Sequence, residues 1–513
     1  MRLARTRSVT LVGVQGHVVD IDVHLGGMPG FRLVGLPDAS LTEAGDRVRA
    51  AVLSSKETWP LQRITVSLSP AALPKRGSHF DLGMAVAILA AGEDDPRIDA
   101  DGIVFLGELA LDGRLRTVQG VLPAALAAAR AGHTRMIVPE PNVGEARLVP
   151  GLKVLGARSL RQVLALVRGL PVPDDDPVDY PGQTTGQVPR DDLDLGDVAG
   201  QDEAKWAVEV AAAGHHHLML SGPPGAGKTM LATRLPTLLP DLTPDESLEV
   251  SAIHSVAGIL PPDAPLVIRP PFAGPHHTAS SVGIVGGGSR ILRPGAASQA
   301  HRGGLFLDEA PEFSGRVLET LRQPLEEGII RVSRAEATAE FPARFLLVLA
   351  QNPCPCGHYG NPNEQCTCRP DAVRRYANRV SGPVRDRIDV RVTVAAPSMA
   401  DIDRAASGTT SGDTSAVVAS RVAEARDRQA KRLTGTPWRT NGELPGSYLQ
   451  QEMPLPPDIA APVHHEIRIG RLSLRGAHRA LRVAWTIADL AGCDAPTADH
   501  VRRAVSLRLG ASG

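Results

Sequence analysis

The residues with the clearest chemical purpose form a glycine-rich segment, Gly222-Pro223-Pro224-Gly225-Ala226-Gly227-Lys228-Thr229. A strand-like apolar run, Leu218–Ser221, leads into the segment, and a helix-like stretch (MLATRLPTLL) follows it. This order predicts a phosphate-binding loop, because glycines let successive backbone N–H groups point at an anion at the positive end of a helix. We expect Lys228 to reach the β- and γ-phosphates of a nucleotide and Thr229 to offer its hydroxyl to Mg²⁺.

Two adjacent carboxylates, Asp308 and Glu309, end a second apolar run that begins at Gly304. We expect Asp308 to hold the hydration shell of Mg²⁺, and Glu309 to orient and deprotonate the attacking water. Alone, an acidic pair after a strand is more often a solvated turn. Together with the phosphate-binding loop, the pair predicts a site for nucleotide hydrolysis.

A third apolar run, Phe345–Gln351, ends at the amide side chain of Asn352. Ligands bind at the carboxyl ends of strands in a parallel sheet, so Asn352 is placed to hydrogen-bond the γ-phosphate or the attacking water. The alternative is an asparagine that only closes a turn. The three runs predict an enzyme that hydrolyses ATP with Mg²⁺.

Four of the five cysteines follow directly, as Cys354, Cys356, Cys366 and Cys368. Two thiolate pairs favour a closed, tetrahedral zinc site with a structural role. The C-x-C pairs are tighter than the usual zinc knuckle, so reduced free thiols are an alternative. A disulfide is the least favoured state, because a reducing compartment is expected.

The elements that must position these residues follow from length and periodicity. A chain of 513 residues exceeds a single hydrophobic core, and strand-like and helix-like stretches alternate, which indicates an α/β fold class with several domains. We expect an N-terminal α/β domain over 1–170, a Pro- and Gly-rich linker over 171–192, a parallel-sheet nucleotide domain over 193–400 and a helical lid over 416–513. In the first domain, the patterns predict strands at 64–68 and 136–138 and helices at 81–92 and 122–131.

Charge and hydropathy limit the functional classes. The net charge is −1, so nucleic-acid binding has to rest on local basic patches. The sequence contains no run of about 18 apolar residues, so no membrane span is expected. At the N-terminus, apolar and polar residues alternate as in a strand, which does not resemble a signal peptide. These features predict a cytoplasmic protein without a membrane partner.

Segments around the three strand ends resemble one family. They are PFAGPHHTASSVGIVGGG (271–288), RPGAASQAHRGGLFLDEAPEF (293–313) and AQNPCPCG (350–357). They look like the magnesium-chelatase-like branch of AAA+ ATPases, and the chain resembles the YifB/ComM family over about residues 5–510. The resemblance implies an AAA+ core that works as a ring, expected to be a hexamer.

The same resemblance proposes catalytic arginines. Ser381–Asp389 looks like the segment that carries the arginine finger, with Arg387 acting on the γ-phosphate of a neighbouring subunit. Arg385 competes for this role, and the alternative is that both arginines pair with aspartates at a surface. In the lid, Leu472–Arg479 resembles the start of a sensor-2 helix, with Arg475 favoured over Arg479 to reach the nucleotide and Ser473 as the cap.

Two further regions are candidates for contact with DNA. Segment 272–288 resembles the insertion that relatives place over the ring pore, and an expected hairpin over 328–341 carries Arg331 and Arg334. The alternative is a solvated hairpin with incidental charges. The lid adds basic residues that serve either DNA or subunit contacts: Arg471, Arg475, Arg479, Arg482, Arg502 and Arg503.

Residues 1–170 resemble the Lon-protease-like domain of this family, through segments 74–83 and 107–121. Lon-type proteolysis needs a serine and a lysine within hydrogen-bond reach. Asp81 stands near the serine position, no lysine follows Gly120, and Ser78 and Lys75 lie three residues apart on an expected loop. We therefore expect an inactive domain that serves as a scaffold or docks DNA.

The resemblance favours a DNA motor: a hexameric helicase that moves branch points in branched or single-stranded DNA during homologous recombination of incoming DNA. The motor subunit of a metal chelatase is the alternative, and an ATP-dependent protease is less favoured because the lysine is missing.

Overall fold

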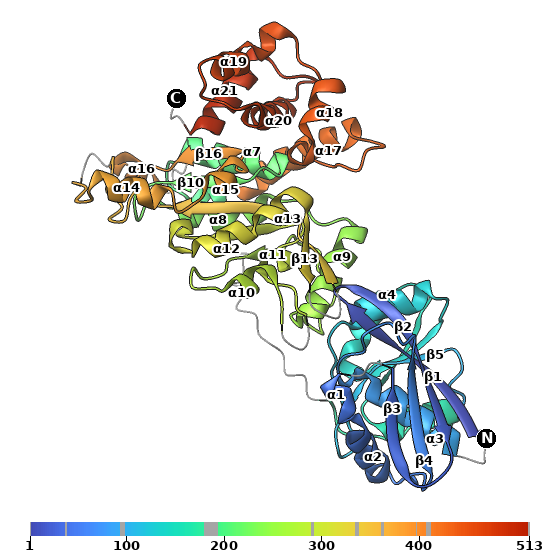
Figure 1. Ribbon diagram of the computed structural model, residues 1–513. Helices are drawn as coiled ribbons and strands as arrows, with labels where there is room; N and C mark the ends of the chain where they lie inside the picture. The colour runs from blue at the N-terminus through green and yellow to red at the C-terminus, as the bar shows by residue number, and fades with distance from the viewer. Residues whose placement is uncertain are drawn as a thin grey trace.

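The computed structural model describes residues 2–35, 38–92, 98–178, 193–288, 292–333, 338–360, 364–396, 398–406 and 412–510. Figure 1 shows three parts in sequence order: an N-terminal sheet domain, a central domain on a parallel sheet, and a group of C-terminal helices. The N-terminus lies at the far end of the first domain, and the C-terminus lies beside the last helices. The α/β fold class expected from the sequence is confirmed.

The N-terminal domain is built on a mixed sheet in the order β3-β4-β2-β1-β5-β8-β9. Its strands are β1 (Arg2–Val12), β2 (Gln15–Leu25), β3 (Gly30–Val34), β4 (Arg63–Ser69), β5 (Ile103–Phe105), β8 (Arg135–Pro139) and β9 (Lys153–Ala157), and β6 (Glu108–Leu109) pairs separately with β7 (Leu115–Arg116). The helices are α1 (Ala39–Thr42), α2 (Ala44–Ser54), α3 (Asp81–Gly92), α4 (Val121–Arg130), α5 (Val143–Ala146) and α6 (Leu160–Arg168). The two strands and two helices predicted in this domain are present, each within one residue of its expected bounds.

Both faces of this sheet are covered by apolar packing. On one face, alternate residues of β2 such as Val19, Ile21 and Val23 pack with α2, α3 and α6. On the other face, Val9, Val104 and Met136 pack with α4. This two-sided burial explains why α3 is almost entirely apolar and lies inside the domain.

The central domain is built on a parallel sheet in the order β11-β12-β15-β10-β16. Its strands are β10 (Leu218–Ser221), β11 (Phe272–Ala273), β12 (Gly304–Leu307), β15 (Leu346–Gln351) and β16 (Val390–Thr393), and β13 (Ile329–Ser333) and β14 (Thr338–Pro342) form a separate hairpin. The helices are α7 (Asp202–Gly214), α8 (Lys228–Arg234), α9 (Pro244–Ala257), α10 (Ser281–Val285), α11 (Ala296–Gln299), α12 (Gly315–Thr320), α13 (Arg322–Glu327), α14 (Pro370–Ala377), α15 (Gly382–Asp386) and α16 (Met399–Ala406). Because every strand of the sheet is parallel, the three polar strand ends predicted from the sequence meet at one edge.

The C-terminal region is helical, as expected. It contains α17 (Ser415–Arg432), α18 (Gly446–Gln451), α19 (Pro457–Arg468), α20 (Leu474–Leu490) and α21 (Ala498–Leu509). Val422 of α17 and Val483 of α20 share a buried core with Val208 of α7, so these helices pack directly on the central domain. Within the described residues, no helix has the length and apolar composition needed to cross a membrane.

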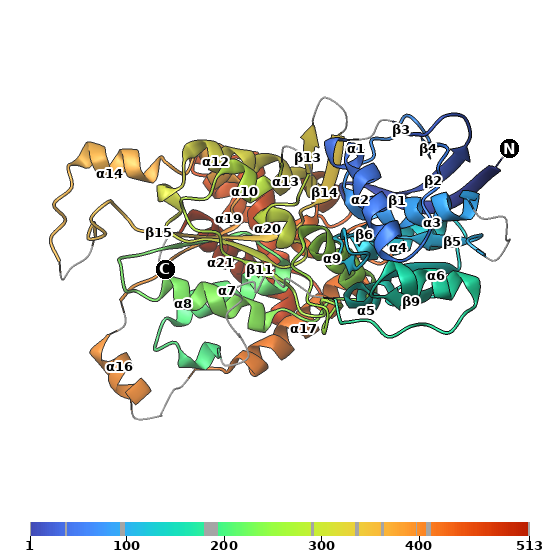
Figure 2. The same ribbon diagram turned by 90° about the horizontal axis from the view of Figure 1, so that it is seen from below.

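The first two domains are packed against each other through α9 and the β13–β14 hairpin, as Figure 2 shows. Ala252 of α9 completes the core under α4, and Phe341 of β14 packs against Leu11 and Val12 of β1. A buried carboxylate, Glu145, accepts hydrogen bonds from the Ser255 hydroxyl of α9 (2.6 Å) and from the backbone N–H of Leu122 (3.2 Å). The hairpin predicted over 328–341 is therefore present, but one of its faces is buried against the N-terminal domain. Of the expected linker, residues 171–178 contain no helix or strand, and 179–192 lie outside the described residues.

Candidate nucleotide and metal sites

The glycine-rich segment connects the end of β10 to the start of α8. Gly225 and Gly227 have φ angles of +74° and +89°, which glycine adopts without the clash that a Cβ would cause. The first backbone N–H groups of α8 thus face the carboxyl end of the parallel sheet, the geometry that binds phosphate.

Lys228 lies at the centre of the site. Its Nζ donates hydrogen bonds to the carbonyls of Gly222 and Pro223 (both 2.8 Å) and to Oδ1 of Asn352 (3.0 Å). Burial lowers the pKa of Lys228, while the nearby carboxylates of Asp308 and Glu309 oppose that shift. The loop, the first helical turn and the end of β15 therefore meet at one ammonium group, where a triphosphate would replace the carbonyl contacts.

The oxygen donors needed for Mg²⁺ lie next to this lysine. The Thr229 hydroxyl donates to Oδ2 of Asp308 (2.8 Å), and Oδ1 of Asp308 accepts from the backbone N–H of Glu309 (2.9 Å). A hydroxyl and a carboxylate suit Mg²⁺, which prefers oxygen ligands and keeps several waters. A cavity of about 360 Å³ is lined by the phosphate-binding loop, Asp308, Glu309 and Asn352.

Glu309 adopts a left-handed backbone conformation, with φ 50° and ψ 46°. Such a conformation costs a non-glycine residue about 1–3 kcal/mol and is concentrated at functional sites. The side chain is half exposed, and its Oε2 lies 3.5 Å from Nδ1 of His277. The backbone thus turns the carboxylate toward the cavity and toward His277.

His277 is a site residue that sequence reasoning missed. It follows β11, which joins β12 as the edge strand of the sheet, so the loop after β11 reaches the acidic pair after β12. Its neighbour His276 stacks against it at 4.1 Å and contacts Thr278 (2.9 Å) instead of Glu309. The adjacent histidines were the signal available in the sequence, but the contact of His277 with Glu309 depends on the order of the strands in the sheet.

Replacing His277 with alanine is expected to lower kcat for ATP hydrolysis about tenfold with little change in KM. The reason is the loss of one polar contact, of about 1–1.5 kcal/mol, that orients Glu309 without touching ATP. Steady-state kinetics measure kcat and KM separately, and His276→Ala is the matched control. Equal losses in both variants, or a change in KM alone, would contradict an orienting role.

The proposed arginines lie outside this cavity within the chain. Arg387 directly follows α15, is buried, and pairs with Glu326 and with the carbonyl of Pro383 (2.7 Å). Arg385 donates to the carbonyls of Ala377 and Val380.

Of the lid arginines, Arg479 and Arg482 are half-buried, and the other four are exposed at the surface. Arg479 pairs with the buried carboxylate of Asp389 (2.7 Å), burial lowers the pKa of Arg482 to about 10, and Arg503 stacks on Trp206 at 3.9 Å. Arg475 is exposed at the start of α20, where Ser473 caps the helix by accepting from Gly476.

The hairpin arginine is also compensated within the chain. Arg331 pairs with Glu327 and with Glu340 (2.8 Å), and Arg334 lies outside the described residues.

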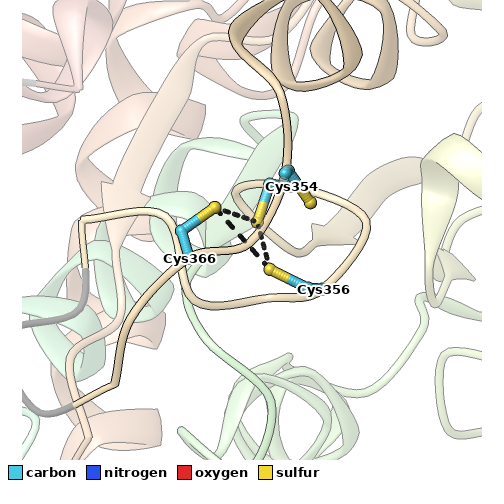
Figure 3. Close-up of side chains that lie close together, drawn as sticks. Cys354, Cys356 and Cys366 are labelled. Atoms are coloured by element: carbon cyan, nitrogen blue, oxygen red, sulfur yellow. Dashed lines mark hydrogen bonds between the residues drawn. The ribbon is translucent and has the colours of Figure 1, made fainter.

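The four clustered cysteines converge on one point. Their Sγ atoms all lie within 4.8 Å of one another. Figure 3 labels three of them. The Sγ atoms of Cys354 and Cys356 are 3.4 Å apart, and each lies 3.7 Å from Sγ of Cys366. A tetrahedral site with Zn–S bonds of about 2.3 Å places its sulfurs about 3.8 Å apart. The donor type, number and spacing therefore fit a Cys₄ metal site, and the separations exceed a disulfide bond of about 2.05 Å.

Hydrogen bonds within the loop favour the thiolate form of Cys356. The backbone N–H groups of His358 and Thr367 lower the pKa of Cys356 to about 5. A thiolate is the form that binds a metal.

The residues considered for a Lon-type dyad have separate partners. Ser78 donates to Glu108, whereas the Nζ of the fully buried Lys75 donates to the carbonyl of Pro70. Asp81, near the position of the missing serine, is buried and pairs with Arg47 (2.9 Å).

Comparisons of this chain with known proteins identify its family. The family model described as magnesium chelatase, subunit ChlI, matches residues 194–402, its C-terminal counterpart matches 412–508, and the model described as subunit ChlI of Mg-chelatase matches 19–142. More distantly, the magnesium-chelatase 38 kDa subunit of Rhodobacter capsulatus is 25% identical over 61% of this chain and 85% of its own. A putative Lon protease homologue of Thermoplasma volcanium is 46% identical over a stretch that covers 11% of each chain.

Several relatives match almost end to end, and three of them represent the range of identity. An uncharacterised protein of Mycobacterium tuberculosis is 48% identical over 99% of both chains. YifB of Escherichia coli is 40% identical over 99% of this chain and 97% of its own, and competence protein ComM of Haemophilus influenzae is 40% identical over 99% and 98%. The chain therefore belongs to the YifB/ComM family of magnesium-chelatase-like AAA+ proteins.

Proposed function

We propose that the protein is an ATP-hydrolysing AAA+ motor that works as a ring, with a hexamer as the expected assembly. The observation that carries this proposal is the meeting of Lys228, Asn352, Thr229 and Asp308 beside Glu309 at one sheet edge. ATP turnover by the purified chain, dependent on Mg²⁺, tests it directly.

The roles of the residues follow from charge and reach. The backbone N–H groups of the loop and the Lys228 ammonium would neutralise the β- and γ-phosphates, and Thr229 and Asp308 would supply oxygen atoms to Mg²⁺ or to its water shell. Mg²⁺, when bound, stabilises the negative charge that develops on the phosphate oxygens. Glu309 takes a proton from the attacking water, Asn352 orients the water or the γ-phosphate, and Arg387 of a neighbouring subunit completes the charge compensation. For Arg475 of the lid, the proposed role is to reach the nucleotide. It is exposed in the single chain and does not line the nucleotide cavity.

We further propose that the cargo of this motor is DNA, branched or single-stranded, and that it acts as a helicase in recombination of incoming DNA. Support comes from the 40% identity with a competence protein. Exposed arginines also occur on α14, at the end of the molecule opposite the N-terminal domain in Figure 2, and include Arg374 and Arg375, of which Arg375 pairs with Asp371 (2.8 Å). Basic side chains on a projecting helix suit backbone phosphates.

The DNA proposal predicts that four-way-junction or single-stranded DNA raises ATP turnover, and that added salt reduces the effect. In Arg374→Glu/Arg375→Glu, DNA binding should weaken and the slope of log K against log salt should fall by about 2, one for each lost phosphate contact. Arg428→Glu/Lys431→Glu on exposed positions of α17 makes the same charge change elsewhere and is the control. If no DNA structure changes turnover or mobility, the DNA proposal is wrong.

A metal-chelatase motor subunit is the second candidate, favoured by the match to the Rhodobacter capsulatus subunit. It predicts stimulation by a porphyrin and a partner chelatase subunit instead of DNA. The separate partners of Ser78 and Lys75 speak against a protease.

We also propose that Cys354, Cys356, Cys366 and Cys368 bind a structural Zn²⁺, and that the protein acts in the cytoplasm, where thiols stay reduced. The separations between the sulfurs support zinc over free thiols. A closed site of four thiolates leaves no open position for catalysis.

A further inference from the structure

The cysteine-rich loop touches the nucleotide site at two points. Asn352, which accepts the hydrogen bond from Lys228, is separated from Cys354 only by Pro353. Farther along, Gly357 lies so close to Pro224 of the phosphate-binding loop that a Cβ on Gly357 would come within 2.4 Å of the proline Cδ. The cysteine-rich loop is therefore in direct packing contact, through Gly357, with the loop that would hold the phosphates.

The connection between cluster and site is stiff. Pro353 and Pro355 have fixed φ angles, and each restricts the residue before it, Asn352 or Cys354, to extended conformations. Cys354 is fully buried, and its Sγ accepts a hydrogen bond from the backbone N–H of Tyr359 (3.3 Å). Because few torsions between the Cys354 thiol and the Asn352 amide are free, a displacement of one is transmitted to the other.

We propose that metal binding by the four cysteines controls the nucleotide affinity of the ATP site. With the metal bound, the loop holds Asn352 against Lys228 and Gly357 against Pro224. Without it, four uncoordinated thiols no longer fix the loop, and the phosphate-binding loop loses the support of both contacts. This inference rests on the proposed zinc and ATP sites and adds a link between them.

A link of this kind is reciprocal. If zinc raises the affinity for nucleotide by some factor, nucleotide raises the affinity for zinc by the same factor. Linked sites typically change each other's affinity about 5- to 150-fold. A zinc that only stapled a surface loop would leave both affinities unchanged.

The test uses the full-length protein and a fluorescent ADP analogue in excess Mg²⁺. Zinc content is measured first and should be close to one ion per chain. The dissociation constant of the analogue is then measured before zinc removal by a zinc-selective chelator, after removal, and after zinc is returned. We expect it to rise at least about fivefold on removal and to recover on return, and saturating nucleotide should protect zinc from the chelator by the same factor.

Single substitutions distinguish loss of the proposed link between the two sites from a general loss of structure. Cys366→Ser should lose zinc and bind nucleotide weakly, whereas Cys493→Ser, a thiol outside the cluster, should keep both. Gly357→Ala should weaken nucleotide binding, because its Cβ pushes on Pro224 and because φ at this position is +85°, which strains alanine. The chelator experiment decides the matter even if Cys366→Ser does not fold.

The possible outcomes distinguish failure of the link, failure of the zinc site and failure of the ATP site. Zinc at about one ion per chain with an unchanged dissociation constant after its removal overturns the link and leaves the zinc site standing. A chain without zinc refutes the zinc site and the link together. A chain that binds zinc but no nucleotide in either state refutes the proposed ATP site instead.

Discussion

Glu309→Gln is expected to reduce ATP turnover by about 10²–10⁴-fold while ATP binding stays near that of the unchanged chain. The substitution removes the group that accepts the water proton but keeps the size of the side chain, so the barrier rises by about 2.7–5.4 kcal/mol. Turnover is measured by phosphate release, and binding by a fluorescent nucleotide. The left-handed backbone at Glu309 is kept, since glutamine meets the same steric cost as glutamate.

A neighbouring carboxylate provides the control. Glu312 lies three residues on, is exposed, and pairs with Arg379 (3.0 Å). Glu312→Gln removes the same charge and should leave turnover within about twofold, because it does not line the nucleotide cavity. Equal turnover in Glu309→Gln and the unchanged chain would show that another group readies the water.

The sequence predicted best those elements that are set by local pattern. β10 covers Leu218–Ser221 and α3 covers Asp81–Gly92, as expected, because apolar periodicity and adjacent loop signals fix both ends. The helix expected after the glycine-rich segment is shorter. α8 ends at Arg234 and continues as a 3-10 turn, since Pro236 cannot donate the next helical hydrogen bond.

Features that depend on strand order or on packing between domains were not predictable. His277 reaches Glu309 only because β11 adds to the sheet beside β12, which no spacing in the sequence reveals. The hairpin over 328–341 was expected from its residues, but its burial against Leu11 and Val12 depends on how the N-terminal domain docks. The charge of the lid arginines can be read from the sequence, whereas Asp389 as the partner of Arg479 and Trp206 as the partner of Arg503 cannot.

Arg387→Ala is expected to lower ATP turnover by about 10³–10⁵-fold, the contribution of an arginine finger to the stabilisation of charge on the γ-phosphate. Arg387 lies outside the nucleotide cavity of its own chain, so this loss would arise between subunits. Mixing Arg387→Ala with Lys228→Ala chains should then restore part of the turnover, since some interfaces would combine an intact pocket with an intact arginine. Each variant alone should be nearly inactive.

The ion pair with Glu326 makes it possible to separate this role from a structural one. If Arg387 only held α15 to α13, removing its partner by Glu326→Ala would be as harmful as removing the arginine. As a finger, Arg387 must leave Glu326 to reach the neighbouring phosphate, so Glu326→Ala should retain turnover. Arg385→Ala tests the competing arginine, which is bound to the carbonyls of Ala377 and Val380. Only a residue that acts across the interface can be supplied by a second chain. A large loss of ATP turnover in Arg385→Ala, together with no restored turnover when Arg387→Ala is mixed with Lys228→Ala, would therefore assign the arginine finger to Arg385.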